Sequence, residues 1–267
     1  MTRLRPWSLA AVTAAVLAGV PTAALAVTAT AVTNSCAAAG TPRSVATLRA
    51  RGDCEITRRL TTLTSDASRV SADQSSLDSS LAGMATHFPA DTNISTIKSK
   101  VDGDLQSIAS LLSTDQAGLT SLKGKIDTQD TTLAQLAPDV RSIVTAYRVY
   151  ALVDPKVHLT IGSDREVVLV DLLTDVEQLE TLRINSLPPG TPGLSAAEAA
   201  LADLGTRLTD AATHNPGGVA SSVAALLPSG YPGNVSTLTA NATLVVAVRD
   251  DLKGARADVQ KIRNALH

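Results

Sequence analysis

Apolar residues recur along this chain at alternating steps of three and four, and the longest run extends from Ile94 to Tyr150. A period near 3.5 is typical of a helix that packs lengthwise against another helix. We therefore predict a single helix of about 85 Å over this stretch. Pro138 should kink this helix rather than end it, because the apolar spacing keeps its phase across the proline. The two polar positions of the run, Asp115 and Gln129, are interpreted as pointing to solvent or fixing register against a partner helix.

Shorter runs with the same spacing predict helices before and after the long one. The first begins at Thr41-Pro42, residues that suit a helix cap and a first position, and ends at His87. Another begins with Asp154 as its cap and extends to about residue 185. A short strand in its first turns is the alternative, but no other segment alternates with period two to pair with it.

Two further helices follow a Pro- and Gly-rich connector. One has Ser195 as its cap and breaks at Asn215, and the last starts near Asn234 and reaches the C-terminus. Together these patterns predict an all-α fold, an elongated antiparallel helical bundle with long coiled-coil-like helices. The expected order is a signal peptide (1–26), a flexible leader (27–41), the long-helix coiled-coil region (42–186), the connector (187–193) and C-terminal helices that pack on the same bundle (194–267).

The N-terminus has the layout of a secretory signal peptide. Arg3 and Arg5 precede an apolar run that ends in Ala24-Leu25-Ala26, an A-x-A cleavage site. We expect export and cleavage, with a retained membrane anchor as the alternative. The predicted location is secreted or extracytoplasmic, in the cell envelope.

The charge and composition of the mature chain exclude several classes of partner. The whole chain has 23 basic and 25 acidic residues, so loss of Arg3 and Arg5 leaves 21 against 25 and a net charge of −4. The sequence has no basic stripe and no aromatic platform of the kind that binds nucleic acids, so no nucleic-acid partner is expected. We expect membrane contact only through an uncleaved signal segment. Because the only Trp, Trp7, leaves with the signal, few aromatic residues remain to line an enzyme pocket.

Cys36 and Cys54 are the only cysteines, and in an exported chain they predict a disulfide. Lipidation of Cys36 is the alternative, but the preceding residues lack the usual leucine of a lipobox. A zinc site is not expected, because two thiols without a nearby histidine do not complete one.

Catalytic and metal-binding patterns are not found in the sequence. The chain has no nucleophile elbow, phosphate loop or Gly-rich dinucleotide fingerprint. The four histidines are far apart, and we expect none to have a second ligand at helical spacing, so no metal, no cofactor and no enzyme activity are predicted. The Arg51-Gly52-Asp53 tripeptide is interpreted as chance, because it lies inside a helical pattern rather than on a loop.

The densest group of aromatic and hydrogen-bonding side chains lies where the long helix should end. One interpretation is packing at the helix end, with Arg148 near the negative end of the dipole. The other is a contact site for a partner. The group consists of Tyr147, Arg148, Tyr150, Lys156 and His158.

Two blocks carry a resemblance, Arg51-Gly52-Asp53-Cys54-Glu55-Ile56-Thr57-Arg58-Arg59-Leu60 and Tyr147-Arg148-Val149-Tyr150-Ala151-Leu152-Val153-Asp154-Pro155-Lys156-Val157. They resemble segments of uncharacterised secreted helical proteins of actinobacteria and other environmental bacteria. The resemblance implies export and an elongated helical shape, and it implies no activity.

These observations favour an exported, non-enzymatic structural or interaction protein of the bacterial cell envelope. It would act as a spacer, an adhesion element or a rod that binds a protein or another envelope component. The alternatives are a carrier of an apolar, lipid-like ligand between helices and an enzyme with dispersed residues. A homo-oligomer is also open, because the same apolar stripes can close within one chain or between two.

Overall fold

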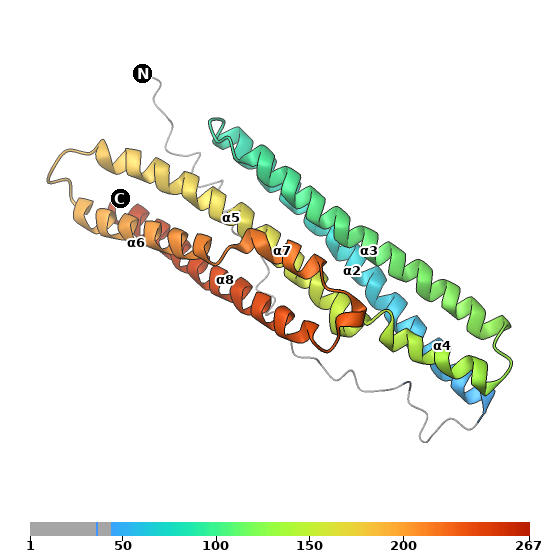
Figure 1. Cartoon of the computed structure of the whole chain (residues 1–267). Helices are drawn as coiled ribbons and strands as arrows, with labels where there is room; N and C mark the ends of the chain where they lie inside the picture. Colours follow the sequence, from blue (N-terminus) through green and yellow to red (C-terminus); the bar gives the residue numbers. More distant parts are fainter. Residues whose placement is uncertain (1–35, 37–43) are drawn as a thin grey trace.

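The computed structural model describes Cys36 and residues 44–267, and it confirms the all-α prediction, because these residues contain no strand (Figure 1). The predicted signal peptide and the leader, apart from Cys36, lie outside the described residues. The helices are α2 Val45–His87, α3 Ile94–Thr128, α4 Leu133–Thr145, α5 Asp154–Asn185, α6 Leu194–Thr213, α7 Pro216–Ala224 and α8 Asn234–Ala265, with a π-helical turn η1 Val149–Val153 and a 3-10 turn η2 Pro228–Gly230.

Helices α2 and α3 form a long hairpin, and they lie side by side along most of their length in Figure 1. The 43 residues of α2 span about 65 Å. Ser44 is its cap, since the side chain accepts a hydrogen bond from the Thr47 N–H at 3.2 Å. The predicted start at Thr41-Pro42 lies outside the described residues, whereas the predicted end at His87 is confirmed.

The prediction of one continuous helix from Ile94 to Tyr150 is wrong. Helix α3 ends at Thr128, and after a short turn α4 runs back along α2 (Figure 1). A capping box starts α4: the Thr132 hydroxyl accepts from the Gln135 N–H, and the Gln135 side chain accepts from the Thr132 N–H. Pro138 lies inside α4, so the predicted kink in one long helix is wrong.

A second break separates α4 from α5. Arg148 adopts the left-handed conformation, with φ 44° and ψ 40°, and the turn η1 then leads directly into α5. Asp154 is therefore a residue within a helical segment and not its cap, which corrects the predicted start. The preference for a helix over a strand is confirmed, and so is the end at Asn185.

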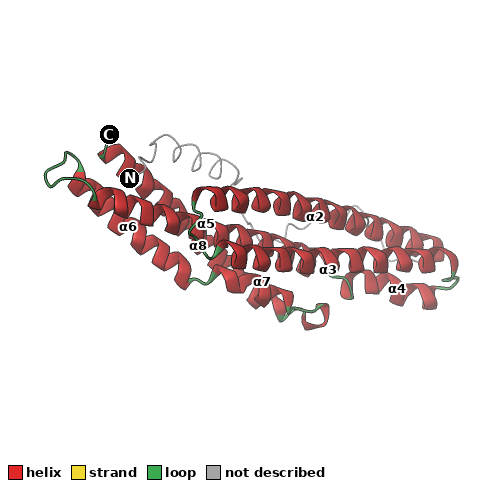
Figure 2. Ribbon diagram, turned by 90° about the horizontal axis from the view of Figure 1, so that it is seen from above, coloured by secondary structure: helices red, strands yellow, loops and turns green. Residues whose placement is uncertain are grey.

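Helix α5 is the centre of the molecule, because it contacts α2, α3, α6, α7 and α8. Helices α6 and α8 pack together beside its C-terminal half, and α2, α3 and α4 form the other arm of the elongated bundle (Figures 1 and 2). The cap of α6 is Gly193, with φ 79°, rather than Ser195, while the predicted start of α8 at Asn234 is confirmed.

A single apolar core joins both arms. It extends from Ile126 and Ile143, where α3 and α4 meet α2, to Ile184 and Ile262 at the far ends of α5 and α8. A smaller cluster lies under α7, around Leu159 of α5. None of the helices described here combines the length and the apolar composition that crossing a membrane requires.

Candidate functional site

The interior of the bundle contains several buried ionisable side chains, and α5 contributes Lys156, Asp164, Glu166 and Glu180. Residues 156 to 177 are all buried or partly buried, because five other helices pack against α5. Several of its polar residues therefore face neighbouring helices, although Asp154 and His158 stay about one-third exposed. Buried charges are stable only when they are paired or neutralised, so each of these groups needs a partner or a shifted pKa.

Asp164 and Glu166 are two buried acids of α5. The Asp164 side chain is fully buried, with the Lys100 ammonium 3.7 Å from its Oδ1, and Glu166 Oε1 lies 4.0 Å from Arg249 Nη2. Burial raises the pKa of Asp164 to about 8, reinforced by Asp104 and opposed by Lys100. Burial also raises the pKa of Glu166 to about 8, opposed by Arg249. Both carboxyl groups therefore carry a proton over much of the neutral pH range.

Three residues of the predicted partner-contact group contact other helices or turns of the same chain. The Tyr147 ring covers Gly118 of α3, where a Cβ atom would lie only 2.6 Å from the tyrosine hydroxyl. The Arg148 guanidinium lies 4.2 Å from the centre of the Tyr231 ring, and its Nε donates to the Pro228 carbonyl at 2.9 Å. Arg59 lies 5.1 Å from the centre of the Tyr150 ring. These contacts are those of helix-end packing.

Lys156 of the same group points inward and away from His158. The residue is 4% exposed, and its ammonium donates to the carbonyls of Ala224 and Leu226 at 3.2 and 2.6 Å. It therefore secures the end of α7 to α5. The structure thus does not gather the five predicted residues at one surface.

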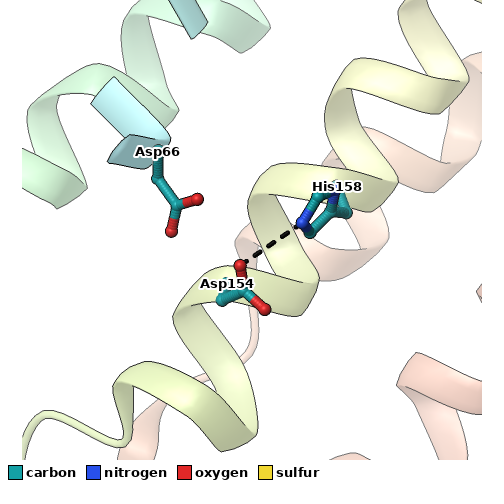
Figure 3. Close-up of side chains that lie close together, drawn as sticks. All are labelled: Asp66, Asp154 and His158. Carbon is teal, nitrogen blue, oxygen red and sulfur yellow. Dashed lines mark ion pairs between the residues drawn. The ribbon is translucent and has the colours of Figure 1, made fainter. Parts of the chain in front are cut away.

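His158 instead joins a cluster with Asp154, one turn earlier on α5, and Asp66 of α2 (Figure 3). One ligand atom from each residue lies within 4.8 Å of the others. His158 Nε2 is 3.3 Å from Asp154 Oδ1 and 2.9 Å from Arg69 Nη1, and the same Arg69 atom is 3.1 Å from Asp66 Oδ1. Burial raises the pKa of Asp66 to about 6, reinforced by Asp154 and opposed by Arg69 and His158.

The expectation that no histidine has a second ligand at helical spacing is wrong for this residue. Asp154 precedes His158 by four positions, which places both side chains on one face of α5. That spacing is the signal in the sequence that indicates the pair. Asp66 gives no such signal, because it comes from a helix far away in the chain.

A second group of carboxyl groups lies where the α2–α3 turn meets α5. It consists of Asp91, Asp171 and Asp175, whose nearest oxygens lie within 4.8 Å of one another. Burial raises the pKa of Asp171 to about 7, reinforced by Asp91, and burial raises the pKa of Asp175 to about 6. Asn93 also donates to Asp171 Oδ1 at 3.3 Å. The raised pKa of Asp171 favours its protonated form near neutral pH, which lessens its repulsion with Asp91.

The predicted disulfide between Cys36 and Cys54 is present, with an S–S distance of 1.98 Å. It indicates an oxidising, extracytoplasmic environment. The neighbouring Arg-Gly-Asp tripeptide lies within α2, where Gly52 is buried and Asp53 pairs with Lys123 at 2.9 Å. This geometry does not present the tripeptide on a loop.

Comparison with known proteins gives no relative from which a role could be transferred: no family model, curated protein or solved structure matches this chain.

Proposed function

We propose that this protein is an exported, non-catalytic helical rod of the bacterial cell envelope, which acts as a spacer or as a support for a partner. The observation that carries the proposal is the single apolar core that runs through both arms of the elongated bundle. A continuous core resists bending between the arms, because closely packed interiors transmit strain instead of absorbing it. A spacer needs this property.

The ionisable groups of α5 support the same function. Arg165 pairs with Asp73 of α2, Lys100 of α3 lies beside Asp164, and Arg249 of α8 lies beside Glu166. The Arg165–Asp73 pair connects the central helix to α2, and basic residues of α3 and α8 approach its two buried acids. Ionisable groups that serve such connections need no substrate to explain them.

Export is supported by the disulfide, by the signal-like N-terminus and by the resemblance to secreted helical proteins. The test is fractionation of the source bacterium with an antibody against the chain, combined with alkylation of free thiols before lysis. We expect the protein in the extracytoplasmic fraction with both cysteines protected from alkylation. A cytosolic protein with alkylated cysteines would contradict the proposal.

The rod itself is tested by small-angle scattering with a mass measurement on the purified mature chain. We expect an elongated particle, and the mass decides between one chain and a homo-oligomer. Cross-linking in intact cells should then join the protein to an envelope component. A globular particle would contradict the proposal.

Native mass spectrometry of the same sample tests the carrier alternative. The shallow depression of about 470 Å³ at the α2–α3 turn is lined by charged as well as apolar residues, among them Phe88, Asp91 and Lys98. It gives an apolar ligand no enclosed volume, so we expect the mass of the protein alone. A retained lipid-like mass would favour the carrier.

A further inference from the structure

The cluster of Asp66, Asp154 and His158 has features that helix packing does not explain. The Asp66 side chain is almost fully buried, and its residue exposure is 1%. Its Oδ1 contacts Arg69, but its Oδ2 is buried and accepts no hydrogen bond from the described residues. Figure 3 shows the carboxylate facing Asp154 and His158 across the space between α2 and α5. A buried oxygen without a partner is unfavourable, and a cation among the three side chains would satisfy it.

The imidazole of His158 is also in conflict with its surroundings. Its Nε2 lies within reach of Arg69, whose guanidinium only donates hydrogen bonds, and of the Asp154 carboxylate, which only accepts when ionised. One ring nitrogen cannot serve both, because it either carries a proton or offers a lone pair. A metal ion in place of the guanidinium would accept electron pairs from the nitrogen and both carboxylates, and the conflict would disappear.

The position of Arg69 makes such an exchange feasible. Its guanidinium contacts Asp66 Oδ1 and His158 Nε2 at once, so it supplies positive charge where a metal ion would lie. Its side chain is 44% exposed and can turn into solvent. His158 and Asp154 are about one-third exposed, at 36% and 34%, which leaves an open side for water ligands.

We propose that Asp66, Asp154 and His158 bind a divalent transition-metal cation such as Zn²⁺, in exchange for the guanidinium of Arg69. One imidazole and two carboxylates, completed by water, are a donor set that suits Zn²⁺. Ca²⁺ prefers oxygen ligands throughout and should bind poorly. The metal would link the middle of α2 to the first turn of α5.

The experiment measures Zn²⁺ affinity of the full mature chain at pH 7.5, by competition with a chromophoric chelator. We expect one Zn²⁺ per chain and at least a ~10-fold loss of affinity in His158→Gln, since even outer-shell changes cost that much at metal sites. Arg69→Gln should bind several-fold more tightly, because the competing cation is gone. The matched control is His214→Gln, since His214 Nε2 also lies near a carboxylate, 3.5 Å from Asp251 Oδ2. It should bind like the unaltered chain, and Ca²⁺ should not displace Zn²⁺.

Four results would overturn the proposal. They are absence of Zn²⁺ binding, unchanged affinity in His158→Gln, an equal loss in His214→Gln, and unchanged or weaker affinity in Arg69→Gln. Asp66→Asn should also lose affinity, but this side chain is buried, so far-UV circular dichroism must first show that the variant folds. His158→Gln keeps the test decisive in any case, because it changes a partly exposed residue. The binding measurement uses purified protein, so its failure is distinguishable from a failure of the proposed role in the envelope.

Discussion

Asp164 of α5 should make the stability of the protein depend on pH in an unusual direction. Its pKa of about 8 in the folded chain lies above the ordinary value of 3.8. The folded state therefore binds the proton more tightly than the unfolded state, and the free energy of unfolding falls as pH rises between these two values. We expect Asp164→Asn, which cannot ionise, to be the more stable protein at pH 8.5 by about 1–3 kcal/mol.

Urea denaturation at pH 5, 7 and 8.5 measures this effect. The difference between Asp164→Asn and the unaltered chain should grow with pH. The matched control is Asp250→Asn, an exposed acid on α8, which should leave the pH dependence unchanged. A difference for Asp164→Asn that shrinks as pH rises would show that the carboxylate is well stabilised in the folded chain.

Arg148 allows backbone strain to be separated from side-chain contact. Its left-handed conformation is unfavourable for any residue with a Cβ atom, but its guanidinium contacts Tyr231 and the Pro228 carbonyl. Arg148→Ala loses the contacts and keeps the strain, so we expect a loss of about 2 kcal/mol. Arg148→Gly loses the contacts and relieves the strain, so it should be about 1 kcal/mol more stable than the alanine variant.

Thermal and urea denaturation of the two variants measure this difference. Equal stabilities would show that the turn imposes no strain at Arg148. The predicted partner contact is tested on the same proteins. If the alanine variant loses stability and still captures the same envelope component, the residue serves packing alone.

At the scale of residues, the sequence indicates side chains that lie close together on one helix. It does not indicate side chains that different helices bring together. The disulfide follows from the presence of two cysteines in a sequence with a signal-like N-terminus, and the Asp154–His158 spacing is readable on α5. Asp66 is polar and nevertheless occupies an inward position of α2. Only the arrangement of the helices in space brings it to His158, so no local pattern contains it.

At the scale of elements, two glycines of α3 allow the effect of packing on stability to be distinguished from that of helix propensity. A Cβ atom at Gly118 would lie 2.8 Å from Cε1 of Tyr147, whereas at Gly124 it would meet nothing within 4 Å. Alanine is favoured over glycine by about 1 kcal/mol in a helix interior. We expect Gly124→Ala to gain up to that amount, and Gly118→Ala to lose about 1–2 kcal/mol because the ring must move.

The melting temperatures of both variants check this prediction. Tyr147→Ala provides the control, because it removes the obstacle. In that background Gly118→Ala should become stabilising. If Gly118→Ala stabilises the unaltered chain as much as Gly124→Ala does, then Tyr147 does not pack against α3 as described.

The reversal between α3 and α4 is the main element that hydrophobic spacing does not reveal. Two antiparallel helices that face the same neighbour both need an apolar stripe, so the stripe can continue in phase through a turn. The local signal is the pair Thr132 and Gln135, a capping box inside a run that otherwise favours one helix. The returning helix also explains the glycine at position 52 of α2. A Cβ atom there would lie 3.0 Å from Val140 of α4, so the glycine allows the two helices to approach closely.

At the scale of the whole molecule, the length of the apolar runs predicts an elongated bundle. The same runs do not indicate which helix lies at its centre. Helix α5 has polar as well as apolar residues among its buried positions, so it lacks the one-sided pattern that identifies a helix with one buried face. Its contacts with α2, α3, α6, α7 and α8 explain the pattern. The stretch with the longest apolar run in the sequence forms α3 and α4, and these two helices lie in one arm of the bundle and not at its centre.

The disulfide should stabilise this molecule without organising it. Cys36 is buried, but it does not belong to the apolar core that joins the two arms. The bridge closes a sequence separation of 18 residues, for which the chain-entropy model gives about 3 kcal/mol. We therefore expect Cys36→Ala/Cys54→Ala to lose about that much free energy of unfolding while keeping its helix content and its scattering profile.

Urea denaturation with and without a reductant, far-UV circular dichroism and small-angle scattering together test this prediction. The reductant should destabilise the unaltered chain by the same amount and leave the double variant unchanged, which separates the bridge from the effect of the alanines. A shorter particle or a loss of helix in the double variant would mean that the bridge holds α2 in place. Because α2 pairs with α3, α4 and α5 along its length, we expect the core to hold it without the bridge.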